Sequence, residues 1–65
     1  MIKTNDLLKT QNGKYRCIAT SKDMAVLAPY SDKRDGGIKT KFSNIIAVHP
    51  QGMGFEFEKV GKVKP

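Results

Sequence analysis

The chain has 65 residues, of which 38% are hydrophobic, and its 12 Lys and Arg against 6 Asp and Glu give a formal net charge of +6. A chain of this length has room for one domain with one small core, and it buries only about 60% of the surface that its unfolded form exposes. The longest apolar runs, residues 24–29 and 45–48, are too short to cross a bilayer, and no apolar stretch of signal-peptide length stands at the N-terminus. The single cysteine, Cys17, excludes an intrachain disulfide, whereas a small secreted domain usually carries several, so we expect a cytoplasmic protein with no membrane partner.

The strongest local signal in the first third of the chain is the pair Asn12-Gly13. Both central positions of a two-residue type I′ turn need positive φ angles, and Asn-Gly is a preferred pair for them. We therefore expect a hairpin of two strands, residues 7–11 and 14–20. Residues 1–6 are expected to form a loose lead-in or a first short strand.

The register that follows from this turn places Lys9 opposite Arg16 and Leu8 opposite Cys17. Side chains alternate between the two faces of a strand, so the hairpin has one core-facing side and one side that carries charges. The predicted core-facing residues are Leu8, Thr10, Tyr15, Cys17 and Ala19. A like-charge pair such as Lys9 and Arg16 destabilises a sheet unless an anion lies nearby, which makes the other face a candidate binding surface.

A second hairpin is expected to return through residues 21–23 into a nearly continuous apolar strand over residues 24–28. Pro29 cannot donate a backbone hydrogen bond, so it must lie at the end of that strand or on an edge of the sheet. Residues 31–37 are polar and end in two glycines, a composition typical of a loop.

Residues 38–42 show the cleanest two-residue alternation in the chain, with Lys39 and Lys41 on one side. The pattern predicts a half-buried strand whose solvent face is wholly basic. The side chains predicted to point into the core are Ile38, Thr40 and Phe42.

The last third of the chain is expected to supply two more strands. A single 3₁₀ turn is predicted near Ser43 and Ile45, and it leads into a buried strand over residues 45–48. Residues 55–60 read as the last strand, with its two phenylalanines inward and its two glutamates outward. Residues 61–65 are a short basic tail that we expect to be frayed.

Five or six short strands without a convincing helix predict one all-β domain over residues 1–65, ordered at about residues 7–60. The paired strands of residues 14–28, and the sequence IKTKFSNII at residues 38–46, give the chain a pattern similar to the SH3-like small barrels of the KOW, Tudor and integrase C-terminal types. The resemblance implies a five- to six-stranded antiparallel SH3-like barrel. Such barrels bind RNA, DNA or peptides, or have structural roles, so the resemblance favours a binding module and leaves the ligand open.

The excess of positive charge and its position on the predicted strands favour nucleic acid as the partner. The lysines and arginines would contact phosphates, and Tyr30, at a strand exit, would either stack on a base or cap the barrel. With two arginines in the chain, we expect backbone-led, weakly sequence-specific binding of DNA or RNA. The predicted nucleic-acid-binding residues are Lys9, Lys14, Arg16, Tyr30, Lys33, Arg34, Lys39 and Lys41.

The sequence offers little for catalysis or metal binding. Cys17 and His49 are the only residues of their kinds, which does not make a zinc site, and no glycine-rich phosphate loop opens a helix. Glu56 and Glu58 lie two residues apart on one strand face, where such carboxylates usually interact with basic side chains on the neighbouring strand. We therefore expect a protein that is not an enzyme and has no cofactor and no metal.

A different class of function stays open, that of a protein-interaction module or an inhibitor that docks on a partner enzyme. An exposed edge beside Pro29, the outward side chains of Leu7 and Ile18, and Met53 in an open loop would then form the contact. A homodimer or a larger ring is a third alternative, because the core is small.

Overall fold

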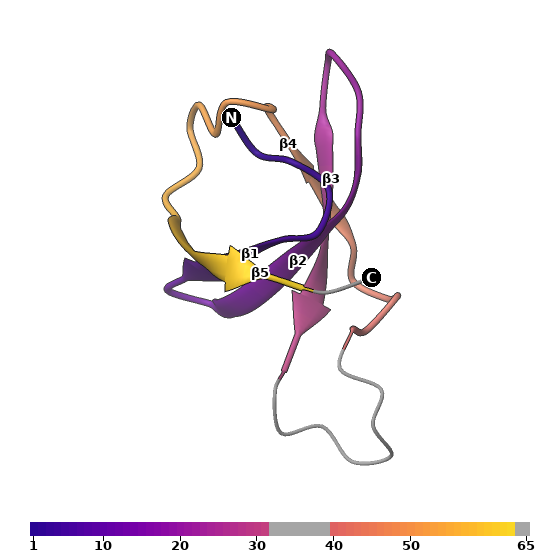
Figure 1. Ribbon diagram of the computed structural model, residues 1–65, viewed down its shortest axis with the longest axis vertical. Helices are drawn as coiled ribbons and strands as arrows, with labels where there is room; N and C mark the ends of the chain where they lie inside the picture. Colours follow the sequence, from indigo (N-terminus) through magenta and orange to yellow (C-terminus); the bar gives the residue numbers. More distant parts are fainter. Residues whose placement is uncertain (32–39, 64–65) are drawn as a thin grey trace.

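The computed structural model describes residues 1–31 and 40–63 of the chain. These residues form an all-β fold of five antiparallel strands in one sheet, and the described ranges contain no helix (Figure 1). The strands are β1 (Asp6–Thr10), β2 (Gly13–Thr20), β3 (Ala25–Tyr30), β4 (Ile46–Val48) and β5 (Glu58–Lys62). The prediction of an all-β fold is therefore confirmed.

The order of the strands in the sheet is β4-β3-β2-β1-β5, so β4 and β5 are its two edges. In Figure 1, β3 stands nearly upright while β1 and β5 lie across it, because the sheet is strongly curled. Strand pairing among the described residues does not close this curled sheet into a barrel.

A bulge in β2 accompanies the change of direction between the two halves of the sheet. Cys17 lies opposite Leu27 and Ala19 lies opposite Val26, so β2 advances by two residues where β3 advances by one. Ile18 is the extra residue, and a bulge of this kind bends a strand and increases its twist. Ala19, predicted to face the core, is exposed because the bulge reverses the alternation beyond Cys17.

The turn between β1 and β2 differs from the predicted one by a shift of register. Thr10 lies opposite Gly13 and Lys9 opposite Lys14, so Gln11 and Asn12 form the turn and Gly13 begins β2. The Thr10 hydroxyl accepts a hydrogen bond from the Asn12 N–H (3.1 Å) and donates one to the Gly13 carbonyl (2.8 Å). Gly13 has a φ of 114°, which only glycine adopts without strain.

The predicted pairings of the first hairpin are therefore wrong by two residues. Lys9 does not lie opposite Arg16, and Leu8 lies opposite Tyr15 instead of Cys17. A shift of two residues preserves the alternation of faces, so Leu8 and Cys17 still share the core-facing side, and both are fully buried.

The core is small and is built mainly on the inner face of β1, β2 and β3. Its fully buried apolar side chains are Ile2, Leu8, Cys17, Ala25 and Leu27. The rings of Phe55 and Phe57 stack with their centroids 5.7 Å apart and pack against this cluster, as predicted for inward-facing residues. Phe42, in contrast, is 66% exposed, so its predicted place in the core is wrong.

The N-terminal segment is part of the folded unit. Ile2 is only 1% exposed and donates its backbone N–H to the Pro50 carbonyl (2.7 Å). Asn5 has a φ of 74° and donates its N–H to the Cys17 carbonyl (2.8 Å). In Figure 1, this segment runs between β1 and the loop that follows β4. Ile2 belongs to the buried core cluster.

Asp6 ties the two ends of the described chain together. Its carboxylate accepts one hydrogen bond from the Lys3 N–H (2.8 Å). It accepts a second hydrogen bond from Lys59 Nζ, with which it forms an ion pair (3.2 Å). Burial alone would raise the pKa of Asp6, but these two hydrogen bonds and the charges of Lys59 and Lys62 hold it below its usual value. Lys59 also donates to the Met1 carbonyl (2.7 Å).

The last strand is shifted toward the C-terminus relative to the prediction. β5 includes Gly61 and Lys62, which were expected in a frayed tail, and Val63 donates its N–H to the Asn5 carbonyl (2.8 Å). The segment with the two phenylalanines is instead held by the preceding loop, where Gly52 (φ 78°) leaves no room for a Cβ against the Phe57 ring. Phe55 donates its N–H to the Gly52 carbonyl (3.0 Å).

The region between β3 and β4 is described only from Thr40 onward. Most of the predicted loop 31–37, together with Ile38 and Lys39 of the predicted strand 38–42, lies outside the described residues. Thr40 is buried and forms an isolated bridge with Tyr30, and residues 43–44 form a bend, not the predicted 3₁₀ turn. No helix in the described ranges is long and apolar enough to span a membrane.

Pro29 lies near the end of β3, as its lack of an N–H requires, but not beside an exposed edge. β3 is an interior strand, in which Pro29 lies opposite Tyr15, and the Pro29 carbonyl accepts a hydrogen bond from the Lys41 N–H (2.8 Å). The exposed edge that was predicted beside Pro29 is therefore absent from the described structure, whose edges are β4 and β5.

Replacing Ile2 by alanine should test whether the N-terminal segment completes the core. Removing a fully buried isoleucine side chain typically costs about 2–5 kcal/mol of unfolding free energy, because a cavity remains. We expect a loss in this range in urea denaturation, while Met53→Ala, at a side chain that is 69% exposed, should change stability little. Equal effects of the two substitutions would contradict the assignment of Ile2 to the core.

The Asp6 carboxylate should make the stability of the protein depend on pH in the acid range. A carboxyl group whose folded pKa is lowered contributes stability above its unfolded pKa of about 3.9, and this contribution is lost as the pH falls through the folded pKa. We expect Asp6→Asn to lower the unfolding free energy at pH 7 by about 1.5–3 kcal/mol, the range for hydrogen bonds to a charged group. The difference from the wild-type protein should shrink as the pH falls below about 4.

The matched control for this experiment is Asp23→Asn in the exposed turn between β2 and β3. Its unfolding free energy should follow that of the wild-type protein across the pH range. A penalty for Asp6→Asn that stays constant from pH 7 to pH 2 would show that the charge of Asp6 has no part in it.

Candidate nucleic-acid interface

Three of the predicted binding residues form a row across the outer face of the sheet, the face opposite to the core. Lys9 of β1 lies opposite Lys14 of β2, and Lys14 lies opposite Tyr30 of β3. Residues that are directly opposite project from the same face, and neighbouring strands are about 4.8 Å apart. We call Lys9, Lys14 and Tyr30 the outer row. Lys9 is exposed, whereas Lys14 and Tyr30 are half-buried.

The ends of the outer row are defined by its neighbours on either side. Glu58 of β5 lies opposite Lys9, and Thr40 pairs with Tyr30 through an isolated bridge. Lys41 follows Thr40 and is exposed, so a further positive charge lies at the Tyr30 end of the row. An acidic residue, Glu58, therefore lies next to the Lys9 end of the outer row, and a basic residue, Lys41, lies near its Tyr30 end.

The outer row contains a like-charge pair, although not the predicted one. The side chains of Lys9 and Lys14 leave the sheet at directly opposite positions, where like charges destabilise strand pairing. A pair of directly opposite basic residues was predicted on the outer face of the first hairpin. The structure places Lys14, and not Arg16, opposite Lys9.

Arg16 has a different environment from the one predicted for it. It lies opposite Leu7 on one side and Ala28 on the other, and it is half-buried. Its Nη1 donates to Thr40 Oγ1 (3.0 Å) and its Nη2 donates to Asn5 Oδ1 (2.9 Å). The guanidinium group thus connects the N-terminal segment to the residues that follow the undescribed stretch.

Sequence reasoning did not identify Asn5 or Thr40 as partners of Arg16. Both are short polar residues far from Arg16 in sequence, and no local pattern links them to it. The positive φ of Asn5 is typical of asparagine in a tight turn, but this gives no indication of what its side chain binds.

The remaining predicted residues are distributed as follows. Lys33, Arg34 and Lys39 lie outside the described residues. Tyr30 lies in the outer row beside Lys14 and is half-buried.

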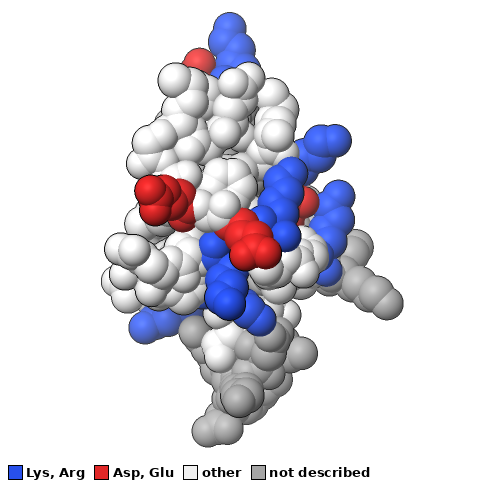
Figure 2. All heavy atoms as spheres, turned by 90° about the vertical axis from the view of Figure 1, so that its left-hand side faces the viewer, with Lys and Arg blue, Asp and Glu red and all other residues white. Residues whose placement is uncertain are grey.

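Positive charge does not cover the molecule evenly. Figure 2 shows Lys and Arg side chains interleaved with Asp and Glu side chains on one face. Glu56 and Glu58, both exposed, belong to the acidic set of the described residues. Binding of a polyanion must therefore depend on a local arrangement of lysines, and not on a uniformly basic surface.

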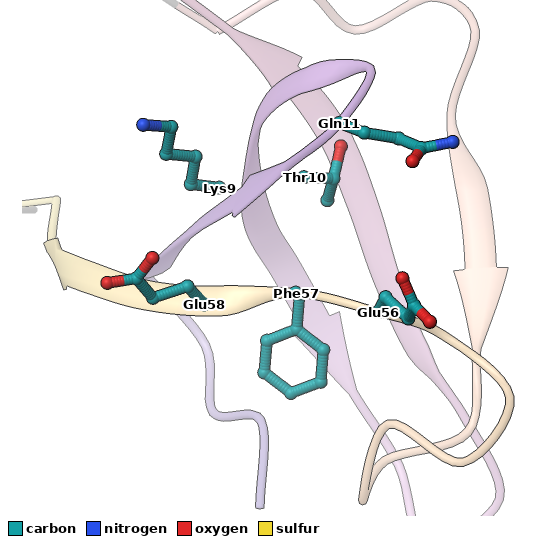
Figure 3. Close-up of a pocket in the computed structure, with 6 residues that line it drawn as sticks. All are labelled: Lys9, Thr10, Gln11, Glu56, Phe57 and Glu58. Atoms are coloured by element: carbon teal, nitrogen blue, oxygen red, sulfur yellow. The ribbon is translucent and has the colours of Figure 1, made fainter.

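A pocket lies beside the first hairpin turn, between the end of β1 and the residues that lead into β5 (Figure 3). Its lining residues are Lys9, Thr10, Gln11, Glu56, Phe57 and Glu58. Two carboxylates and one ammonium group give this pocket an acidic balance, which does not suit a phosphate ligand. Lys9 therefore lies at the boundary between an acidic pocket and the outer row.

Cys17 and His49, the single residues of their kinds, have different environments. Burial raises the pKa of the Cys17 thiol, which donates a hydrogen bond to the Ala19 carbonyl (3.4 Å). His49 is exposed, and its Nδ1 accepts the Gln51 N–H (3.1 Å). Within the described residues, no group of three or more His, Cys, Asp or Glu side chains could hold a metal ion.

Comparisons of the chain with protein-family models, with curated proteins and with solved structures find no match.

Replacing Thr40 by valine should test the connection through Arg16. The substitution keeps the shape of the side chain but removes the acceptor of the Arg16 Nη1 hydrogen bond, and a hydrogen bond to a charged group typically contributes about 1.5–3 kcal/mol. A double-mutant cycle of Thr40→Val with Arg16→Met, measured by urea denaturation, should show favourable coupling between the two side chains. Additive effects of the two substitutions would contradict this connection.

Proposed function

We propose that the protein is a small, non-enzymatic module that binds nucleic acid through the outer row, by backbone contacts with weak sequence preference. The observation that carries the proposal is the pairing of Lys9 with Lys14 and of Lys14 with Tyr30, which brings two cations and an aromatic ring together on one face. The net charge of +6 supports it, because a basic domain attracts a polyanion over distances of about the Debye length.

A single strand is the form of nucleic acid that this arrangement fits best. Lysines hold phosphates without regard to sequence, while an accessible aromatic ring can stack on a base only where that base is unpaired. Tyr30 next to Lys14 offers both contacts side by side. The exposed Lys41 beyond Thr40 would extend the phosphate contacts past Tyr30.

The resemblance to SH3-like barrels and a cytoplasmic location belong to the same proposal. The buried thiol of Cys17 is unpaired and is compatible with a reducing compartment. Phosphate contacts by Lys33, Arg34 and Lys39, which are predicted from the sequence alone, remain part of the hypothesis.

A second candidate function, docking on another protein, is favoured by the exposed apolar side chains. Phe42 is 66% exposed and Met53 is 69% exposed, although Leu7 and Ile18, which were predicted to face outward, are half-buried. Exposed aromatic and methionine side chains are enriched in protein interfaces. Recovery of a protein partner by wild-type protein but not by Phe42→Ser, without oligonucleotide binding, would favour this candidate.

Binding of single- and double-stranded oligonucleotides over a series of salt concentrations should test the proposed function. The affinity should fall as salt rises, and each lost phosphate contact should lower the slope of log K against log salt by about 0.7 for a single strand. We therefore expect Lys9→Gln/Lys14→Gln to weaken binding and to reduce this slope by about 1.4. Fluorescence anisotropy with labelled oligonucleotides measures both quantities.

The control for this variant is Lys3→Gln/Lys22→Gln, which makes the same change in net charge at exposed positions outside the outer row. The control should retain most of the wild-type slope. An affinity that is absent at low salt, or that does not depend on salt, would contradict the proposed function.

A further inference from the structure

The guanidinium group of Arg16 carries a charge that the described residues do not neutralise. Its two hydrogen-bond acceptors, Thr40 Oγ1 and Asn5 Oδ1, are both neutral oxygens. Its Nε is buried and has no hydrogen-bond partner in the described structure. Withdrawing a charged group from water without an opposite charge is unfavourable, so this environment is one that an anion would stabilise.

Arg16 also lies on the same face as the outer row. It is two residues from Lys14 along β2, and its partner Leu7 is two residues from Lys9 along β1. Diagonal neighbours on such a ladder are about 7–8 Å apart, within the reach of long side chains. Three cationic side chains therefore project from one small area of the sheet.

We propose that Arg16 is the fixed phosphate-binding residue of the outer face, which takes one phosphodiester group of a bound strand while Lys9 and Lys14 contact the phosphates next to it. The inference rests on the proposed nucleic-acid function, because it assigns a residue to one phosphate of that ligand. Asn5 and Thr40 hold the planar group from two separate segments, so little side-chain freedom is lost when it binds. Since Nε is shielded, the phosphate approaches the two Nη atoms, which carry further N–H groups.

The geometry of the guanidinium group favours phosphate over a simple halide ion. Its parallel N–H groups match two oxygens of one phosphate, whereas a lysine offers a point charge without that match. Arg16→Lys keeps the charge and loses the paired donors, so it separates the two contributions. Inorganic phosphate is a suitable probe, because it presents the same oxygens without a base or a sugar.

The experiment is a titration of the protein with inorganic phosphate at pH 7 and constant ionic strength, with chloride as the balancing anion. The Arg16 Nε–Hε signal and the backbone amides of Arg16 and Leu7 are followed by ¹⁵N NMR. We expect saturable shifts of these signals in the wild-type protein and in the control Lys22→Gln. Arg16→Lys should weaken phosphate binding about tenfold, which corresponds to about 1.4 kcal/mol.

The possible outcomes separate this inference from the proposed function. Shifts that do not saturate, that map away from Arg16, or that Lys22→Gln abolishes would overturn the phosphate-binding role of Arg16, and so would unchanged affinity in Arg16→Lys. Oligonucleotide binding with the wild-type affinity in Arg16→Lys would also overturn it, while the outer row would retain its proposed function. Saturable phosphate binding at Arg16 without any oligonucleotide binding would support the anion site and contradict the nucleic-acid function. If Arg16→Lys fails to fold, the wild-type titration alone decides the question.

Discussion

The structure depends on β2, because this one strand has to pair with both halves of a curled sheet. Its first half lies beside β1, and the whole strand lies beside β3. The extra residue, Ile18, bends β2 between these halves and lets the inner face wrap around Leu8, Cys17 and Leu27. The outer row also crosses β2, because Lys14 lies between Lys9 of β1 and Tyr30 of β3. The bulge lies beyond Cys17, so the whole outer row lies on the β1 side of it.

The core on the inner face of the sheet is small, and segments near both ends of the described chain add contacts to it. Ile2 enters the core from one end of the chain. The ion pair of Asp6 with Lys59 then connects β1 to β5. Next to it, the Val63 N–H donates a hydrogen bond to the Asn5 carbonyl. Burial of the Asp6 carboxylate costs desolvation free energy, which the Lys3 N–H and the exposed Lys59 ammonium group help to offset. The termini are thus structural parts of the fold.

Local patterns in the sequence predicted the all-β class, the first hairpin and the faces of its strands, but not its pairing. Turn propensity favours Asn12-Gly13 at the centre, whereas the Thr10 hydroxyl bridges a turn that begins one residue earlier. Such competition between side chain and backbone is not visible in a turn pattern. Ile2 was missed because one isoleucine in a polar stretch has no periodicity. For the candidate site, the basic hairpin face was predictable, while the environment of Arg16 depends on contacts that only tertiary structure creates.

Three cationic side chains of the described structure lie on one face, and this is the strongest physical reason to connect that face with an anion. Lys9 and Lys14 lie at directly opposite positions, and the neighbouring Arg16 donates its hydrogen bonds to neutral oxygens. Neither arrangement improves the packing of the core, which lies on the other side of the sheet. In a domain with a small core, a few kcal/mol are a large part of the total stability. A phosphate backbone on this face would bring negative charge to the lysine pair and to the guanidinium group together.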